Sequence, residues 1–238
     1  MTFKLRADEG WWQDIPKLIE RAVGIYTKLE KDPIHITATK IIEERGWVVN
    51  SNLVEPVVRS MGVLYVPKKL FPGPMFLFPE IDTDGKMRAQ TKPLHEVFGP
   101  GKYFSIGVKK EEFNGPIWLG NDEDTLKNIL ERKFVVLVEG PFDIIAAKAV
   151  VPHIPIMSSL TKTFGKKHED YLRILGVKTV YLLYDNDEAG KKSMEVLSHF
   201  IKTMKIVPLE CPASDPSDCL KSRVKKEALQ RVLEELEQ

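Results

Sequence analysis

The chain has 238 residues, of which 43% are hydrophobic, 29% charged and 9% aromatic. These values lie near the average for soluble globular proteins and exclude a collagen-like, low-complexity or wholly disordered chain. The 35 Lys and Arg residues nearly balance the 34 Asp and Glu residues, which leaves a net charge of +1. Net charge therefore does not indicate a nucleic-acid binder, and any such binding must depend on local basic patches.

Targeting signals and cysteine frameworks are not evident in the sequence. No stretch approaches roughly 18 consecutive apolar residues, and the N-terminus has acids and a proline where a signal peptide needs an apolar run. We therefore expect a cytoplasmic protein with no membrane partner. Cys211 and Cys219 form neither a CxxC pair nor a four-cysteine zinc site, so we expect no structural zinc and no disulfide framework.

Helices are predicted first along the chain. Residues 11–30 carry apolar side chains at helical spacing, which indicates a helical N-terminal arm. Residues 39–45 and 53–61 are predicted as shorter helices, with Pro56 capping or bending the second.

The next region, residues 62–119, has a different texture. Prolines and glycines recur there, with a strand predicted at residues 75–78 and a turn at residues 82–85. This composition indicates a mixed, largely antiparallel α/β region.

From residue 134 onward the pattern becomes regular. Residues 134–138 read FVVLV, a continuous apolar run that is typical of a strand buried on both faces, and Pro141 suits the first position of a helix. The alternation continues with strands at 154–157, 179–184 and 206–210 and helices at 168–175, 188–204 and 225–236. Strands that alternate with helices predict an α/β fold with a parallel sheet of right-handed βαβ units.

Acidic residues follow three of the four predicted parallel strands. They are Glu139 and Asp143 in VEGPFD, Asp185 and Asp187 in YDNDEAG, and Asp215 and Asp218 in SDPSD. Ligands of open parallel sheets bind beyond the carboxyl ends of the strands, so these side chains should share one edge. Carboxylates that share a site raise one another's pKa, and Mg²⁺, which prefers oxygen ligands, would resolve that repulsion. The sequence therefore predicts a metal site.

Four of these six acids also have a purely structural interpretation. Asp143 would complement a helix dipole, Asp187 would be an N-cap, and Asp215 and Asp218, which flank Pro216, would be turn or cap residues. Two glycines accompany the acids: Gly140 would allow a tight turn after Glu139, and Gly190 would allow the helix after Asp187 to approach its neighbours closely.

The order strand, EG, helix, strand, DxD, AG, helix over residues 134 to about 222 resembles the Toprim domain, which primases, topoisomerases, nucleases and recombination mediators share. The segments VEGPFDIIAAKA, SSLTKTF, LLYDNDEAGKKS and SDPSDCL most resemble the catalytic core of DnaG-type DNA primases of bacteria and their phages. Upstream, IIEERGW, MFLFPEIDTDGKMRAQ, GKYFSIG and PIWLG stand in the order found in the smaller subdomain of those primases.

The resemblance implies a division of the chain into an N-terminal helical arm (1–35), a mixed α+β subdomain (36–133), a Toprim domain (134–222) and a C-terminal helix (223–238). Primases of this type usually also carry a zinc-binding domain and a helicase-binding domain. No Cys or His precedes His35, and the chain ends about 20 residues after Asp218, so neither domain is expected in this sequence.

By the same resemblance the protein would be a nucleotidyltransferase, a DNA-dependent RNA polymerase that makes short RNA primers on single-stranded DNA from ribonucleoside triphosphates. Glu139, Asp185 and Asp187 would be catalytic, with Glu139 near the 3′-hydroxyl as ligand or general base. Two Mg²⁺ or Mn²⁺ ions would be held by the six acids above, with Asp143 assisting from behind the direct ligands, and no zinc would be needed.

Basic side chains would hold template or nucleotide phosphates. The resemblance points to Lys102 and, more loosely, to Arg88, and local basic patches add Lys162, Lys166 and Lys191. Each would otherwise be an ordinary exposed surface cation. A replicative helicase or a separate zinc-module protein is an expected partner, in the cytoplasm of a bacterium or of a bacterial host of a phage or plasmid.

Two other functions stay open at this point. In a Toprim nuclease the same metal cluster would activate water and cut nucleic acid without nucleotides. A non-catalytic nucleic-acid-binding factor of replication or recombination would bind DNA without turnover.

Overall fold

The structure is a computed structural model, and it describes residues 14–68, 70, 73–81, 86–94, 104–107, 112, 118–159 and 164–237. The chain divides into two compact units. The first comprises residues 1–37 and 62–115, and the second comprises residues 38–61 and 116–238. The sequence-based boundaries at residues 35, 133 and 222 stay a prediction.

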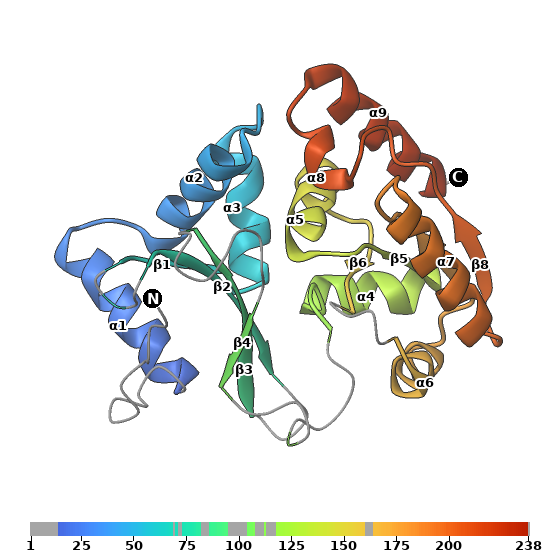
Figure 1. Cartoon of the computed structure of the whole chain (residues 1–238), viewed down its shortest axis with the longest axis horizontal. Coiled ribbons are helices and arrows are strands. Elements are labelled where there is room, and N and C mark those ends of the chain that lie inside the picture. The colour runs from blue at the N-terminus through green and yellow to red at the C-terminus, as the bar shows by residue number, and fades with distance from the viewer. Residues whose placement is uncertain are drawn as a thin grey trace. The chain divides into compact units, whose positions relative to one another are not determined.

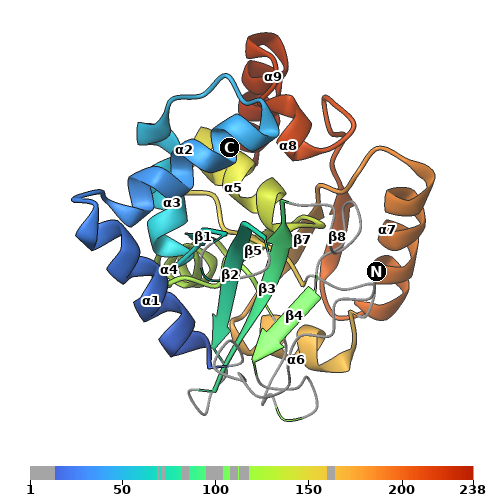
Figure 2. The ribbon, with the colours of Figure 1, turned by 60° about the vertical axis from the view of Figure 1, so that its left-hand side comes forward.

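The first unit is built on an antiparallel sheet in the order β1-β2-β3-β4 (Figures 1 and 2). Its strands are β1 (Leu64–Val66), β2 (Met75–Ile81), β3 (Met87–Pro93) and β4 (Phe104–Gly107). Alternate residues of a strand point to one face, and on one face Met75 and Leu77 of β2 pack with Ala89 of β3. The predicted antiparallel region is therefore confirmed. The turn predicted at residues 82–85 lies outside the described residues.

Helix α1 (Ile15–Lys28) covers that face of the sheet. Its first turn is capped by Asp14, whose side chain accepts a hydrogen bond from the Lys17 amide. Ile15 and Leu18 enter the same apolar core as the strands. The helix predicted over residues 11–30 is thus present over residues 15–28, and it packs on the sheet of the first unit.

Two more helices follow, α2 (Pro33–Arg45) and α3 (Ser51–Ser60). Helix α2 begins six residues earlier than the predicted start at residue 39. Proline suits the first turn of a helix because its fixed φ is helical, and the Asp32 carboxylate accepts a hydrogen bond from the Ile34 amide at 2.8 Å. Both signals favour a helix start at Pro33. Pro56 lies inside α3 rather than at its cap.

The second unit contains a parallel sheet in the order β6-β5-β7-β8. Its strands are β5 (Phe134–Leu137), β6 (Ile156–Met157), β7 (Thr179–Leu182) and β8 (Lys205–Pro208). All four residues of β5 are buried, as the apolar run predicts for a strand covered on both faces. The predicted α/β fold with a parallel sheet is confirmed.

The helices of this unit are α4 (Glu123–Arg132), α5 (Pro141–Val150), α6 (Lys166–Ile174), α7 (Glu188–Phe200), α8 (Pro216–Cys219) and α9 (Arg223–Glu234), and the short η4 (Glu235–Glu237) follows α9 (Figure 1). Ile129 of α4, Leu172 of α6 and Leu197 of α7 share one core with Leu137 of β5 and Leu182 of β7. Helices α4 and α8 were not predicted.

Helix α7 is shorter than predicted, ending at Phe200 instead of residue 204. Beyond it, the Lys202 amide and the Thr203 hydroxyl both donate to the carboxylate of Glu169 on α6. These bonds hold the chain in a non-helical path between α7 and β8, because the Lys202 amide donates to a side chain instead of to a carbonyl of the preceding helical turn.

Candidate functional site

The centre of the parallel sheet is where its connections change direction. β5 is first in the chain, its next strand β6 lies on one side of it, and β7 lies on the other. Crevices of open α/β sheets form at such a switch point, beyond the carboxyl ends of the strands. β5 and β7 end in register, with Leu137 beside Leu182, and the Leu183 amide donates to the Leu137 carbonyl at 2.9 Å. The chain therefore delivers Glu139 and Asp185 to adjacent positions.

The pKa of Asp185 is strongly perturbed by its surroundings. Burial, and after it the charges of Glu139, Asp215, Asp187 and Asp218, raise the pKa of Asp185 to about 7. Within the part of the chain that the structure describes, its Oδ1 atom is buried without a hydrogen-bond partner. Acids from three strand ends therefore act on one carboxylate, as the sequence predicts.

Glu139 is held through its backbone. The Ser158 hydroxyl, at the end of β6, donates to the Glu139 carbonyl at 2.8 Å. Its Oε1 atom is shielded from solvent. The backbone of Glu139, which follows β5, is thus tied to the end of the neighbouring strand β6.

Asp187 and Asp215 are N-caps, as the structural interpretation of these two acids predicts. Asp187 Oδ1 accepts from the Gly190 amide at 2.7 Å at the start of α7, and Asp215 Oδ1 accepts from the Asp218 amide at 2.5 Å at the start of α8. An N-cap and a metal ligand are compatible roles for one carboxylate, because its two oxygens have about four acceptor sites.

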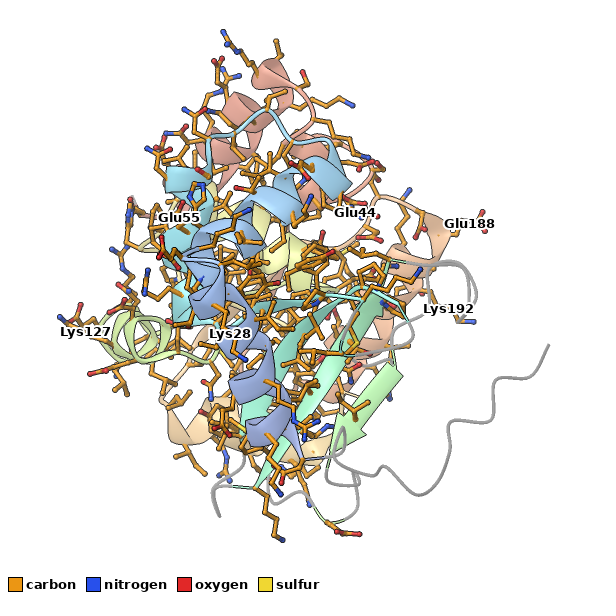
Figure 3. All side chains as sticks on the ribbon, turned by 90° about the vertical axis from the view of Figure 1, so that its left-hand side faces the viewer. Lys28, Glu44, Glu55, Lys127, Glu188 and Lys192 are labelled. Carbon is orange, nitrogen blue, oxygen red and sulfur yellow. The ribbon has the colours of Figure 1, made fainter. Side chains whose placement is uncertain are left out.

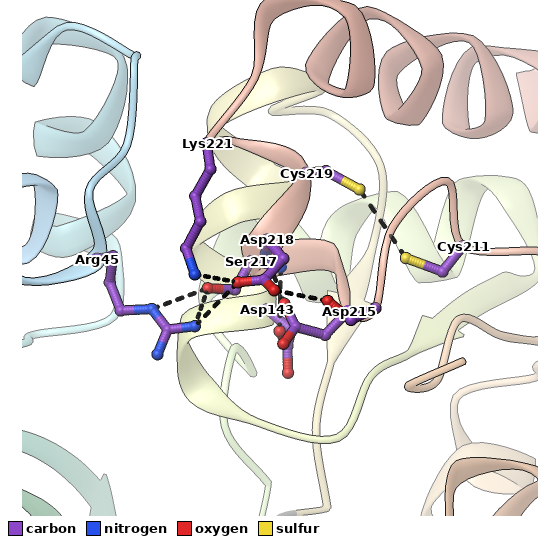
Figure 4. A network of polar contacts seen from close by, with 9 residues as sticks. Arg45, Asp143, Cys211, Asp215, Ser217, Asp218, Cys219 and Lys221 are labelled. Carbon is purple, nitrogen blue, oxygen red and sulfur yellow. Dashed lines mark hydrogen bonds and ion pairs between the residues drawn. The ribbon is translucent and has the colours of Figure 1, made fainter. Parts of the chain in front are cut away.

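Asp143 is buried and tied to two helix starts. Its Oδ2 accepts from the Gly140 amide at 2.9 Å and its Oδ1 from the Ser217 amide at 3.2 Å (Figure 4). Burial, followed by the charges of Asp215 and Asp185, raises the pKa of Asp143 well above its usual range, against the effect of these two hydrogen bonds. Its position joins α5 to α8.

Asp218 lies among cations. The Lys221 ammonium is 2.5 Å from its Oδ1, the Ser214 hydroxyl donates to its Oδ2 at 2.6 Å, and the Arg45 guanidinium is 4.0 Å away (Figure 4). Burial would raise the pKa of Asp218, but the hydrogen bonds from Lys221 and Ser214 outweigh it and lower the pKa.

Arg45 is a site residue that sequence reasoning missed. Its Nε and Nη2 donate to the Ser217 hydroxyl at 3.0 and 2.6 Å, and its guanidinium lies 5.1 Å from the ring centre of Phe142. The only signal was its place in IIEERGW, which carries the resemblance but does not tell what the arginine contacts. The contacts join the end of α2 to α8 and α5.

Gly190 allows a close approach that no side chain would permit. A Cβ atom at this position would lie 2.0 Å from the Asp185 carbonyl oxygen. The predicted close packing at Gly190 is therefore present, and its neighbour is the backbone of the central aspartate itself.

The predicted phosphate-binding cations differ in burial and in their partners. Arg88 is buried, with Nε 3.0 Å from Glu80 and Nη2 donating to Ser105 at 2.7 Å, so its guanidinium is already paired inside the first unit, and the alternative of an exposed surface cation is wrong. Lys166 is exposed and pairs with Glu169 and Asp170.

Of the three remaining cations, the structure describes Lys191 alone. Lys191 is exposed in the first turn of α7, the helix that Asp187 caps; Glu188 and Lys192 of the same helix are labelled in Figure 3. Lys102 and Lys162 lie outside the described residues.

The acids fit a divalent cation, although three ligating side chains do not already stand together among the described residues. Mg²⁺ usually binds through one or two carboxylates plus water and substrate phosphates, so a preformed cage is not required. The buried Oδ1 of Asp185 and the mutual repulsion that raises its pKa both indicate a place where a cation is favoured.

Comparison with known proteins agrees with this geometry. Residues 136–220, which contain most of the parallel sheet and its acidic loops, match the family described as Toprim-like (Toprim_2). The search of curated proteins found no match.

Solved structures extend the likeness to both units. The zinc-binding and RNA polymerase domains of the Aquifex aeolicus primase match with a TM-score of 0.65 and 21% identity, over 98% of this chain and 62% of that one. The RNA polymerase domain of Mycobacterium tuberculosis primase DnaG matches with a TM-score of 0.64 and 17% identity, over 94% and 84%. A DnaG primase catalytic domain bound to single-stranded DNA matches with 0.63 and 17%, over 96% and 81%.

The chain thus has the fold of the RNA polymerase domain of DnaG-type primases, and the resemblance drawn from its motifs is confirmed at the level of the fold. This chain spans less than two thirds of the Aquifex chain.

Among the helices that the structure describes, none combines the length and the apolar character needed to span a membrane.

Proposed function

We propose that this chain is a nucleotidyltransferase that makes short RNA primers on single-stranded DNA, as a DNA primase. The observation that carries the proposal is the meeting of Glu139 and Asp185 at the switch point of a sheet with the fold of primase RNA polymerase domains. Divalent cations held there would neutralise phosphate charge and orient the attacking and leaving oxygens.

The acids divide into direct and supporting roles. Asp185, Asp187, Asp215 and Asp218 are the proposed ligands of Mg²⁺ or Mn²⁺, and Glu139 stands near the primer 3′-hydroxyl as a ligand or general base. The hydrogen bonds of Asp143 to the starts of α5 and α8 support a positioning role for it. Its buried carboxyl holds the acidic loop after β8 against the loop after β5.

The template and nucleotides are proposed to lie along basic side chains. Lys102, Lys162, Lys166 and Lys191 are the candidates, since Arg88 is already paired with Glu80 inside the first unit. Contacts of this kind are made to phosphates, so template affinity should fall steeply with salt. The expected partners are single-stranded DNA and ribonucleoside triphosphates, and a helicase or zinc-module protein remains a further proposal.

The test is primer synthesis in vitro. The protein is incubated with single-stranded DNA, labelled ribonucleotides and Mg²⁺ or Mn²⁺, and the products are separated on a sequencing gel. We expect short labelled oligoribonucleotides that are absent with Glu139→Gln and Asp185→Asn. Glu43→Gln, which removes an exposed charge paired with Lys40 on α2, is the matched control and should retain synthesis.

The alternatives give different products. No labelled product from the wild-type protein, even with a pre-annealed RNA primer, would exclude polymerisation. Cleavage of the template without nucleotides would then indicate a nuclease, and DNA binding that is unaffected by Glu139→Gln would indicate a non-catalytic factor.

A further inference from the structure

The two cysteines of the chain bracket the acidic loop that follows β8. Cys211 lies in the loop after β8, and Cys219 is the last residue of α8, eight positions later. Between them lie Asp215 and Asp218, the two acids of that loop. Both thiols are free and buried, and their Sγ atoms are 3.9 Å apart (Figure 4).

The two thiols differ in access. Cys211 lines a cavity of about 550 Å³, together with Ala213 and Ser214 of the same loop and Lys225 and Val232 of α9. Cys219 does not line this cavity and has no exposed surface. A small reagent can therefore reach Cys211 first, while Cys219 is placed behind it.

We propose that Cys211 and Cys219 form a redox-active dithiol site that reacts with low-molecular-weight disulfides and closes to an intramolecular disulfide. The Cys211 thiol gives up its proton and its sulfur attacks one sulfur of the reagent, which breaks the S–S bond of the reagent, forms a mixed disulfide and releases one reagent thiolate. The Cys219 thiol then gives up its proton as its sulfur attacks Cys211, which breaks the mixed disulfide, forms the Cys211–Cys219 bond and releases the second reagent thiolate. The two protons go to the two reagent thiolates. Two protein thiols are oxidised and one reagent disulfide is reduced to two thiols.

Closing this bond moves atoms that position the acids. A disulfide has an S–S length of about 2.05 Å, so the two sulfurs must approach by about 2 Å. The loop is held at several points on the way: the Asn186 amide donates to the Ser214 carbonyl at 2.7 Å, and the Ser217 amide donates to Asp143. The two side chains turn toward each other about their Cα–Cβ bonds, and the rest of the approach is taken up by the segment between the two cysteines, which carries Asp215 and Asp218.

The consequence for metal binding rests on the proposed function, whereas disulfide formation does not. Asp215 caps α8 and its charge acts on Asp185, so movement of α8 changes the distance between the acids of two strand ends. Displacing groups that orient metal ligands typically costs on the order of tenfold or more in metal affinity. Oxidation is therefore expected to weaken metal binding reversibly.

The covalent step is tested on the full chain by mass spectrometry. The protein is equilibrated with oxidised and reduced glutathione, quenched with N-ethylmaleimide and analysed intact and after proteolysis. We expect loss of two hydrogen atoms, a peptide linkage between Cys211 and Cys219, and full reversal by dithiothreitol. Unmodified thiols in the folded protein, or disulfides formed only between chains, would overturn the proposal.

Two variants test the order of the steps. Cys219→Ser should accumulate glutathione on Cys211, because the second thiol is missing. Cys211→Ser should leave Cys219 unmodified, because that sulfur is not reached from the cavity. Equal labelling of the single cysteine in both variants would contradict the assigned roles. The wild-type measurement stands even if either variant folds poorly.

Mn²⁺ titration of the reduced and oxidised wild-type protein tests the consequence. We expect affinity about tenfold weaker after oxidation and restored by dithiothreitol. Equal Mn²⁺ affinity in both states would overturn the coupling to the acidic loop and leave the dithiol site intact. Absence of Mn²⁺ binding in either state would instead count against the proposed function.

Discussion

At the scale of single residues, Asp185 is the carboxylate on which the acids of three strand ends act. Its pKa is raised to about 7 by burial and by four neighbouring acids. In the unfolded chain this carboxyl loses its proton near the usual pKa of 3.8, whereas in the folded, metal-free protein it keeps the proton up to about pH 7. Between these two values the folded state holds more protons. Its stability must therefore fall as the pH rises through this window.

This gives a pH-dependent prediction. In a chelator, the free energy of unfolding of the wild-type protein minus that of Asp185→Asn should decrease from about pH 4 to about pH 7. The slope should stay below the limit of ~1.4 kcal/mol per pH unit, since solvent screens a half-buried group. Urea unfolding at a series of pH values measures it, and a flat difference would mean that Asp185 titrates normally.

Gly190 offers a second prediction at the same scale. In Gly190→Ala the new Cβ would meet the Asp185 carbonyl at 2.0 Å, so the loop must move. Displacements of about 1 Å can cost on the order of 100-fold in rate. We expect primer synthesis to fall by about 10- to 100-fold while the protein stays folded by circular dichroism.

Gly24→Ala is the matched control for that change. Its added Cβ would lie in open space on α1, with no atom within 4 Å, and a helical alanine should stabilise the fold by about 0.5–1 kcal/mol. Full activity in Gly190→Ala would show that the loop tolerates the displacement.

At the scale of elements, Arg45 connects α2 to α8. The Arg45 guanidinium donates to Ser217 from two nitrogens and also lies over the Phe142 ring. Lysine has a single nitrogen and no planar group, so it cannot make both contacts. In Arg45→Lys we expect faster hydrogen exchange at the Ser217 and Asp218 amides and a loss of primer synthesis of about tenfold. Arg173→Lys, on the exposed side of α6, should change neither.

A buried ion pair joins α4 to α5. The Lys148 ammonium pairs with Asp122, the N-cap of α4, and donates to the Thr125 hydroxyl at 2.5 Å. Lys148→Met leaves the buried Asp122 charge uncompensated, which costs about 3–5 kcal/mol. In urea unfolding, Lys148→Met combined with Asp122→Asn should recover part of this loss, since asparagine still caps the helix. Additive losses would show that the two side chains are not coupled.

Elements that are formed by residues close together in the sequence can be predicted from it, whereas elements that depend on residues distant in the sequence cannot. Strand β5 is a continuous apolar run, β7 is rich in β-branched and aromatic residues, and acids follow both strands directly in sequence, so both the sheet and its acidic edge follow from the local pattern. Helix α8 has only four residues and depends on the Asp215 cap and on Asp143, which is distant in sequence. Arg45 and Arg88 show the same limit, since their partners are set by tertiary contacts.

At the scale of the whole molecule, the acids of the Toprim-like unit form one electrostatic system. Three strand ends contribute to it, the loops are tied by the Asn186 and Ser217 amides, and the fold is that of primase RNA polymerase domains. Removing one central charge should therefore change the affinity of the whole cluster for a divalent cation, while an isolated surface acid should not.

Calorimetric titration of Mn²⁺ near neutral pH is the most direct test of the proposed metal site. The titration is made into the wild-type protein, Asp185→Asn and Glu43→Gln. We expect the wild-type protein and Glu43→Gln to bind Mn²⁺ with equal affinity and to release protons, because a carboxyl with a pKa of about 7 is deprotonated on binding. Asp185→Asn should bind at least about tenfold more weakly. Equal affinity in all three proteins would contradict the assignment of the metal site to the ends of β5 and β7.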